Sequence, residues 1–359
     1  MAHDNDNSKD SIVTVIVVNF NSGGFLKATA ESVLKSTATL ELIVVDNCST
    51  DQSLLQLADS FYADPRLKII RNRLNAGFAK ANNIAIAKAR GDYILILNPD
   101  CIIEPDTIRH LAIEMQTRED VGAAGVLIHN PDGTEQAGCR RTIPTPWRTL
   151  VRVFHLDRYL SRYSRFRSFE MKNSPLPEVP VEVEAISGAF MFVKRRAIDA
   201  IGLLDDKYFM HCEDLDWCMR FRRAGWKILF IPHIKILHYK GVCSNQNPFK
   251  VMWYKHFGMM RFYRKFFKHQ YPAPIMILVF IGIWLRFISI VTYNIFSNKF
   301  GLSKKTLHTT QIQPSFEITQ SSRALSSEVA IDKHQPNPSC PEIRPMHSAS
   351  PLTENQTKL

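Results

Sequence analysis

Residues 91–100 read GDYILILNPD, which is a Gly-Asp turn, five apolar residues and an Asn-Pro-Asp turn. A short apolar run between two turns is typical of a strand buried on both faces. Toward the N-terminus, similar runs alternate with segments of helical pattern. The expected strands are 12–18, 40–45, 67–70 and 93–97, and the expected helices are 25–36, 49–62 and 76–89. This alternation predicts right-handed βαβ units and a mostly parallel α/β sheet with helices on both faces.

Polar residues follow each expected strand at its carboxyl end, where parallel sheets bind their ligands. They are Asn19, Asp46, Asn72, Asn98 and Asp100. A carboxylate such as Asp100 suits a divalent metal beside a diphosphate, although Asn-Pro-Asp is also a common turn. Asp46 can accept a hydrogen bond from a nucleotide base or cap the next helix. Gly77 can admit a phosphate or ribose, or serve only its turn.

The second half of the chain carries a denser acidic cluster. Residues 210–217 read MHCEDLDW, with three acids in four positions at the start of a helix expected over 213–224. The helix dipole favours acids at that place, but a general base for a hydroxyl also requires a carboxylate at a cleft, and Asp214 is the candidate. His238 follows a strand expected over 227–231. Its imidazole can be structural, or it can complete a metal site that already holds one carboxylate.

Composition limits the class of protein. The 359 residues are 45% hydrophobic and 22% charged, as in folded domains. The net charge of +11 is concentrated in 140–172 and 249–270, which indicates a local anionic partner. The seven cysteines contain no CxxC pair, which argues against a zinc site or a disulfide framework. No apolar signal core follows the polar N-terminus, so we expect the catalytic part in a reducing cytosol.

The C-terminal third suggests contact with a membrane. Residues 274–296 are long enough to cross about 30 Å of hydrocarbon at about 1.5 Å per residue, but Arg286 near the centre makes insertion marginal. The basic, aromatic segment 255–268 resembles an interfacial helix on anionic lipid. We expect a half-inserted or re-entrant segment, with a single span or a helical lid on the catalytic domain as alternatives.

These patterns predict the following domain organisation. The ends, 1–10 and 301–359, are expected to be disordered because they are polar and poor in large apolar residues. A catalytic domain is expected over 11–248, with a nucleotide-binding half at 11–100 and an acceptor-binding half at 101–248. Membrane-associating helices are expected over 249–300.

Six blocks of sequence together carry a family resemblance. They are VVNFNS (17–22), VVDNCSTD (44–51), NAGFAKANN (75–83), GDYILILNPD (91–100), SGAFMFVKRRAIDAIGLLDDKYFMHCEDLDWCMRFRRAGWKI (187–228) and LHYKGVCS (237–244). In this order they resemble the inverting nucleotide-sugar transferases called glycosyltransferase family two, which have the GT-A fold. The nearest likeness is to the rhamnosyltransferase-like branch. The resemblance covers about 12–245, roughly two thirds of the chain.

The resemblance implies a donor site at the strand ends. Asn19 and Phe20 would line the nucleotide pocket, and Asp46 would contact the base. Asn75 and Gly77, which precede the third helix, would also contact the donor.

The resemblance also implies a metal and a base. Asn98 and Asp100 stand where the family has its DxD motif, and the first acid is Asn here. Asp100 would therefore hold Mg²⁺ or Mn²⁺ while Asn98 reaches the ribose, and His238 matches a position that helps to coordinate the metal. Asp214 matches the catalytic base, with Glu213 beside it orienting the acceptor or the helix start.

The implied reaction is a single in-line displacement with inversion at the anomeric carbon, in which Gly188 lets the acceptor sugar approach the backbone. The expected donor is dTDP-L-rhamnose, and the expected acceptor is a glycan or lipid-linked sugar in cell-surface polysaccharide assembly. We expect the enzyme at the cytoplasmic face of the cell membrane, in contact with anionic lipid and without a nucleic-acid partner.

Three alternatives remain open from the sequence. The first is the same fold with another UDP- or GDP-sugar donor. The second is a sugar nucleotidyltransferase, but its usual basic loop after the first strand is missing, because no Lys or Arg occurs from Asn19 until Lys27. The third is a non-catalytic membrane scaffold, which the intact set of Asp100, Asp214 and His238 disfavours.

Overall fold

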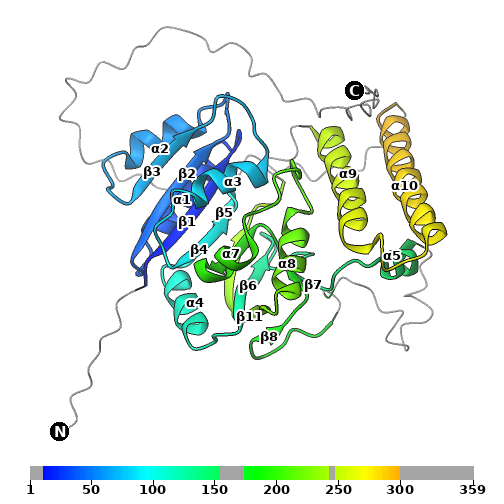
Figure 1. The fold of residues 1–359 in the computed structure, drawn as a ribbon. Coiled ribbons are helices and arrows are strands. Elements are labelled where there is room, and N and C mark those ends of the chain that lie inside the picture. Colours follow the sequence, from blue (N-terminus) through cyan, green and yellow to red (C-terminus); the bar gives the residue numbers. More distant parts are fainter. Residues whose placement is uncertain (1–10, 154–170, 172–173, 242–246, 300–359) are drawn as a thin grey trace, which may run out of the picture.

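The four strands expected in the N-terminal part form one side of a nine-stranded sheet (Figure 1). They run parallel in the order β3-β2-β1-β4. Their bounds are β1 Val13–Asn19, β2 Leu40–Asp46, β3 Leu67–Arg71 and β4 Tyr93–Leu97. Both β1 and β2 are buried along their whole length, as their β-branched sequences predict. The structure is a computed structural model that describes residues 11–153, 171, 174–241 and 247–299; the expected disordered ends lie outside these residues.

The rest of the sheet comes from the second half of the chain. β10 (Phe190–Lys194) runs antiparallel to β4 and to β6 (Val121–His129), and β11 (Lys227–His238) runs parallel to β6. β5 (Cys101–Ile102) and β8 (Val181–Glu182) pair with β11, whereas β7 (Arg140–Arg141) and β9 (Ala185–Ile186) form a separate ribbon. The sheet is continuous across residue 100, and the predicted domain boundaries stay predictions.

Helices connect and flank the strands (Figure 1). They are α1 Phe25–Leu34, α2 Ser53–Phe61, α3 Phe78–Ile86, α4 Thr107–Gln116, α5 Pro146–Val153, α7 Arg195–Ile201, α8 Glu213–Arg223, α9 Pro248–Phe267 and α10 Ala273–Lys299. The core between them is continuous, and its largest fully buried side chain is Trp217 of α8.

The last strand is longer than the sequence indicated. β11 continues past the expected end at residue 231 as far as His238, and its register against β6 shifts between Ile231 and Lys235. Pro232 lies in this irregular stretch, where a missing N–H does not interrupt the ladder. The extension carries His238 beside Cys101 of β5. The imidazole therefore belongs to the sheet edge rather than to a loop beyond it.

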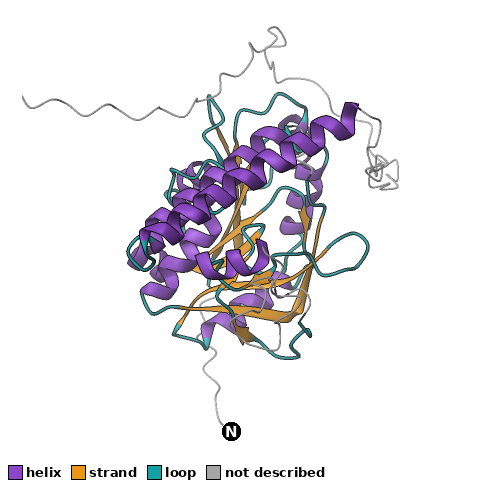
Figure 2. Cartoon of the chain, turned by 90° about the vertical axis from the view of Figure 1, so that its right-hand side faces the viewer, coloured by secondary structure: helices purple, strands orange, loops and turns teal. Residues whose placement is uncertain are grey.

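The two C-terminal helices lie side by side along one flank of the sheet domain (Figures 1 and 2). α9 packs against α8, and α10 packs against the outer side of α9. By length and composition, Ala273–Tyr293 of α10 could cross a membrane, although 22% of that window is buried within the protein.

The expectation about cysteines needs one correction. Cys48, in the loop after β2, is disulfide-bonded, while Cys101, Cys139, Cys212 and Cys218 are free and buried. The partner of Cys48 lies outside the described residues. Spacing along the sequence excluded local pairs such as CxxC, but it says nothing about one pair that is distant in the chain.

Candidate active site

Asn19 and Asp46 meet at the carboxyl ends of β1 and β2. The Asn19 Nδ2 donates to Asp46 Oδ1 (2.8 Å), Ser49 Oγ (3.0 Å) and Ser53 Oγ (2.8 Å), while its Oδ1 accepts from Ser22. Asp46 Oδ2 accepts from the Ser49 N–H at 3.3 Å. The N-cap position of α2 has no side-chain hydrogen bond, so Asp46 does not cap that helix. Phe20, half-buried, follows directly.

The neighbouring loop is held by Asn47, which the sequence did not single out. Its Nδ2 donates to Asn75 Oδ1 at 2.8 Å, and its Oδ1 accepts from the Ala76 N–H at 3.0 Å. Gly77 follows with φ +84°, and a Cβ there would lie 2.6 Å from the Phe209 carbonyl oxygen. Both the backbone conformation and the space require glycine. The turn at Gly77 is thus fixed against the segment that leads to α8.

Asp100 and His238 face each other at the ends of β4 and β11. Both are buried, and Asp100 Oδ1 lies 3.0 Å from His238 Nε2. The His238 Nδ1 lies 2.6 Å from Gln136 Oε1, and the Gln136 Nε2 donates to Asn130 Oδ1 at 2.9 Å. This chain of bonds makes Gln136 an acceptor and places the proton of a neutral imidazole on Nδ1. The Nε2 lone pair is then directed at the carboxylate.

Two acceptors that face each other at this distance suit a bound cation. With His238 in this neutral form, the buried Asp100 Oδ1 has no hydrogen-bond donor among the described residues. A carboxylate oxygen and an imidazole nitrogen are ligands that a divalent metal accepts. Gln136 orients the imidazole through its other nitrogen, as is usual for histidines that bind a metal. Cys101 lies within reach of both. Burial raises the pKa of its thiol, which points to the Ala189 carbonyl, so Cys101 is a poor ligand.

Asn98 connects this pair to the acidic start of α8. Its Nδ2 lies 3.4 Å from His238 Nε2, and its backbone N–H donates to the Ala189 carbonyl at 2.9 Å. The preceding residue, Gly188, donates its N–H to Asp214 Oδ2 at 3.1 Å. The predicted metal ligands and the predicted base therefore border the same short stretch, residues 188–189.

Asp214 is held from three directions. Its Oδ2 pairs with the Arg141 guanidinium of β7 and accepts from Gly188, and its Oδ1 accepts from the Leu215 N–H at 2.7 Å. The side chain retains 14% exposure. A carboxylate that is fixed in direction, compensated in charge and still reachable is suited to accept a proton from a ligand.

The turn before α8 is strained and gives Glu213 a different environment from Asp214. His211 and Cys212 both have left-handed backbones, with φ 68° and 70°, which cost free energy in non-glycine residues and are frequent at functional sites. Glu213 is buried, and its Oε2 has no partner among the described residues. Burial, followed by the charge of Asp214, raises the pKa of Glu213 well above its ordinary value. Glu213 therefore holds a proton where Asp214 is placed to accept one.

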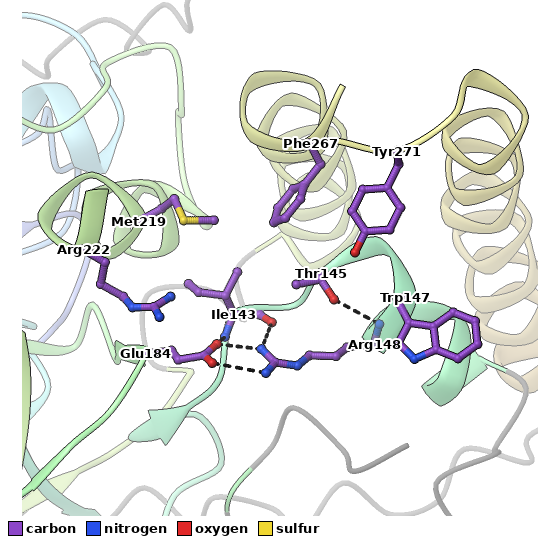
Figure 3. A pocket seen from close by; sticks show the side chains of 9 residues that line it. All are labelled: Ile143, Thr145, Trp147, Arg148, Glu184, Met219, Arg222, Phe267 and Tyr271. Atoms are coloured by element: carbon purple, nitrogen blue, oxygen red, sulfur yellow. Dashed lines mark hydrogen bonds and ion pairs between the residues drawn. The ribbon is translucent and has the colours of Figure 1, made fainter. Parts of the chain in front are cut away.

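A pocket of about 730 Å³ lies between α5, the C-terminal half of α8 and the end of α9 (Figure 3). Asp214, in the first turn of α8, is not among its lining residues. Arg148 makes two hydrogen bonds to Glu184, at 2.6 and 3.2 Å, and Arg222 points into the same space. The rings of Trp147 and Tyr271 stand at the other side. The pocket is lined by Ile143, Thr145, Trp147, Arg148, Glu184, Met219, Arg222, Phe267 and Tyr271.

The structure brings the predicted residues to one edge in two clusters. Asn19, Asp46, Asn75 and Gly77 form the first with Phe20 beside them, and Asn98, Asp100, His238, Glu213 and Asp214 form the second. Sequence reasoning missed Asn47, Gln136 and Arg141. Only Asn47 had a visible signal, because it directly follows a strand end.

The model of the family "Glycosyl transferase family 2" matches residues 14–198. The N-acetylglucosaminyl-diphospho-decaprenol L-rhamnosyltransferase of Mycobacterium tuberculosis is 26% identical over 249 residues, which are 66% of this chain and 79% of the relative. The rhamnosyltransferase WbbL of Escherichia coli is 25% identical over 239 residues, 64% of this chain and 83% of the relative.

Among solved structures, the mannosyltransferase PcManGT from Pyrobaculum calidifontis, in complex with GDP-Man and Mn²⁺, has a TM-score of 0.51 at 15% identity. The match covers 77% of this chain and 69% of that one. At this identity the likeness concerns the fold, and it confirms the predicted GT-A architecture. The family match confirms a glycosyltransferase with rhamnosyltransferase relatives, in place of a nucleotidyltransferase. The chain belongs to glycosyl transferase family 2.

Proposed function

We propose that this enzyme transfers L-rhamnose from dTDP-L-rhamnose to a lipid-linked glycan with inversion at the anomeric carbon, and that a divalent metal is required. The observation that carries the proposal is the meeting of Asp100 and His238 beside Asp214, through Asn98 and residues 188–189. Family membership supports the reaction class. The donor sugar is supported by the names of the two rhamnosyltransferase relatives.

In this proposal Asp100 and His238 hold Mg²⁺ or Mn²⁺. When bound there, such an ion would supply positive charge for the diphosphate leaving group. Gln136 keeps the Nε2 of His238 available by accepting the Nδ1 proton. Asn98, whose Nδ2 lies close to the imidazole, is placed to donate to the ribose or the diphosphate.

The donor base and ribose are assigned to the cluster at the ends of β1 and β2. Asp46 would accept from the imide N–H that thymine and uracil share, and Asn19 would hold Asp46 in that orientation. Phe20, Asn75 and Gly77 border the same edge. This cluster is nearly complete in its internal hydrogen bonds, so it can accept a nucleotide with little rearrangement.

Chemistry is assigned to Asp214. The acceptor hydroxyl loses its proton to the Asp214 carboxylate while its oxygen forms a bond to the anomeric carbon. The bond between that carbon and the diphosphate oxygen breaks, and the diphosphate leaves with the electron pair. Arg141 compensates the carboxylate charge before the proton arrives, and protonated Glu213 orients the acceptor or supports the start of α8.

The acceptor is assigned to the pocket between α5, α8 and the end of α9, from which it would extend along α8 to Asp214 (Figure 3). The ribbon β7–β9 joins Arg141, beside the base, to Ile143 and Glu184 at the pocket wall. Aromatic rings together with an Arg–Glu pair suit a sugar, and Arg222 suits an anionic group attached to it. One relative is named for a diphospho-decaprenol acceptor, which supports a lipid-linked sugar and a place at the membrane. The cytoplasmic face is part of this proposal.

The test is release of nucleoside diphosphate from a panel of nucleotide sugars by the full-length protein. We expect dTDP release from dTDP-L-rhamnose with Mg²⁺ or Mn²⁺, and loss of that release with EDTA. NMR analysis of a transferred product should show the inverted configuration. Release from only a UDP- or GDP-sugar would contradict the assigned donor, and release from no donor at all would contradict the proposed function.

A further inference from the structure

Helix α10 has two different apolar faces. Met276, Val279, Ile283 and Phe287 are at most 8% exposed and form the seam against α9 and α5. On the opposite side, Ile277, Ile281, Leu285 and Ile288 are 49–58% exposed; we call these four residues the outer stripe. With Phe280 and Trp284 they border an apolar groove of about 300 Å³. Figure 2 shows this long helix across the outside of the molecule.

The outer stripe continues onto α9. The rings of Trp253 and Trp284 lie 5.4 Å apart, and those of Phe249 and Phe287 lie 5.7 Å apart. Phe249, Trp253 and Phe257 of α9 are 37–53% exposed. The two helices thus present one apolar and aromatic surface, and contiguous exposed surfaces of this kind mark sites of contact with proteins or membranes.

α9 is fastened to the catalytic half of the protein. Lys265 bonds both Asp205 (2.8 Å) and the buried Asp216 of α8 (2.6 Å), and Arg261 bonds Asp205 at 2.7 Å. A Cβ on Gly258 would come within 2.9 Å of the His211 carbonyl oxygen, so α9 lies directly on the turn that places Asp214. Part of the basic charge that the sequence assigned to lipid therefore serves to hold α9 on the protein.

This attachment limits how α10 can meet a bilayer. A helix of 27 residues is about 40 Å long. If α10 crossed the membrane, α9 and its charged contacts with α8 would have to enter about 30 Å of hydrocarbon with it. With the helices packed as they are, a crossing is excluded. The helix pair can only lie along the membrane surface, with the outer stripe directed into one leaflet.

We propose that the α9–α10 pair is an in-plane docking surface for the anionic leaflet of a lipid bilayer. The charge pattern favours lipid over a protein partner, because no Asp or Glu occurs between Asp216 and Glu317. Arg264, Lys268 and Arg286 are exposed at the borders of the apolar surface, as in interfacial helices. The proposal deepens the membrane location given under the proposed function, and it is independent of the catalytic assignments.

The orientation has a functional consequence. The pocket assigned to the acceptor ends at Phe267 and Tyr271, where α9 turns into α10. A lipid-linked sugar held there has its lipid beside the docking surface. Docking through the outer stripe therefore brings Asp214, the proposed catalytic base, to the same leaflet as the lipid chain of the acceptor.

The test is flotation of the full-length protein with vesicles. The variant Ile281→Glu/Leu285→Glu changes two stripe residues. The matched control Leu55→Glu/Tyr62→Glu makes the same change at α2 and the residue after it, where Leu55 and Tyr62 are 56% and 81% exposed. We expect wild type and control to float with phosphatidylcholine–phosphatidylglycerol vesicles and the stripe variant to lose at least tenfold in binding. Release of nucleoside diphosphate from the soluble donor, measured without lipid, should be equal in all three and verifies their folding.

Two further measurements, the depth of α10 in the bilayer and the self-association of the protein, can contradict the proposal. A fluorescent amino acid placed at Ile277, Ile281, Leu285 or Ile288 in turn should be quenched by lipids brominated at one shallow depth, equally at all four positions. Quenching that deepens steadily along the helix would show a span and overturn the proposal. Equal flotation of the stripe variant, or a lipid-free dimer that this variant dissociates, would overturn it as well. Failure here with normal donor turnover leaves the proposed transferase activity standing.

Discussion

Two clusters lie at the same edge of the sheet but differ in their hydrogen bonding. We call Asn19, Asp46, Asn75 and Gly77 the donor cluster, and Asn98, Asp100, His238, Glu213 and Asp214 with Arg141 the catalytic cluster, after the roles proposed for them. In the donor cluster, both polar ends of Asn19 are bonded and both oxygens of Asp46 accept a hydrogen bond. In the catalytic cluster, buried atoms of Asp100, Glu213 and Arg141 have no hydrogen-bond partner among the described residues. The protein itself satisfies the polar groups of the first cluster, whereas the second keeps buried polar atoms that a bound ligand could satisfy, as the proposed function requires.

This difference predicts where substitutions act. Groups that are satisfied by the protein contribute to stability when the chain folds, and their removal leaves buried partners unpaired. Polar groups that find a partner only in a ligand contribute to binding or catalysis, and they often lower the stability of the ligand-free protein. The donor cluster should therefore respond to mutation mainly in stability, and the catalytic cluster mainly in metal binding and turnover.

The largest expected effect is the loss of the base. Asp214→Asn keeps the shape and can still accept from Gly188 and Arg141, but it cannot take a proton. Transfer should fall by about 10²–10⁴-fold while the dissociation constant of the donor stays within a factor of about three. Calorimetric donor titration on the same sample is the control for folding. Loss of donor binding would make Asp214 a part of the donor cluster and break the comparison.

The next effect is on stability and contrasts the two clusters directly. Asn19→Ala removes the donor that Asp46 and Ser53 share, and should lower the free energy of unfolding by about 2–4 kcal/mol. Asp100→Ala removes a buried oxygen that has no hydrogen-bond partner among the described residues. It should change the free energy of unfolding by less than about 1 kcal/mol in metal-free buffer. Urea denaturation of both variants measures the difference. Equal losses would contradict the proposed division of roles.

A smaller effect concerns the support of the metal site. Gln136→Met removes the acceptor of the His238 Nδ1 proton and should weaken Mn²⁺ binding by about 10–100-fold. Gln136→Glu keeps an acceptor oxygen and should retain most of the affinity. An unchanged affinity in Gln136→Met would show that the bond to Gln136 only stabilises the fold.

The smallest effect is a pH dependence from Glu213. Burial, then the charge of Asp214, raises the pKa of this carboxyl above 4.5 in the folded protein. The folded state therefore holds a proton that the unfolded chain releases, and stability falls as pH rises above 4.5, at most by about 1.4 kcal/mol per pH unit. Glu213→Gln has no carboxyl group to titrate, so the variant does not lose this stability. Its free energy of unfolding relative to that of wild type should increase from pH 5 to pH 8 in denaturation experiments. A constant difference across that range would contradict the assigned burial effect.

The donor cluster could be predicted from sequence because its signals are local. β-branched runs identify buried parallel strands, and the first polar residue after each run stands at the ligand edge. Asn19 and Asp46 meet as adjacent partners in the β1–β2 register. The same reasoning placed Asp100, and the extension of β11 brought His238 to it.

Gln136 and Arg141 could not be predicted in the same way. Gln136 lies in a loop after β6 and reaches His238 only through the pairing of β6 with β11. Arg141 is one of nine cations in the basic stretch 140–172, and nothing local marks it as the partner of Asp214. For α9, a basic and aromatic helical pattern fits lipid and protein equally, and only the ion pairs to Asp205 and Asp216 show that part of its charge is used to pack on the protein.

The central claim is that the catalytic cluster is a metal site with a separate base. The most direct test is a titration of the purified protein with Mn²⁺ in the presence of dTDP. Electron paramagnetic resonance measures the free ion at each step. Asp100→Ala should lose more Mn²⁺ affinity than the roughly 10–100-fold expected for Gln136→Met, which only removes the support of His238. Asp214→Asn should bind Mn²⁺ as wild type does. Wild-type binding by Asp100→Ala, or equal losses in both variants, would contradict the account.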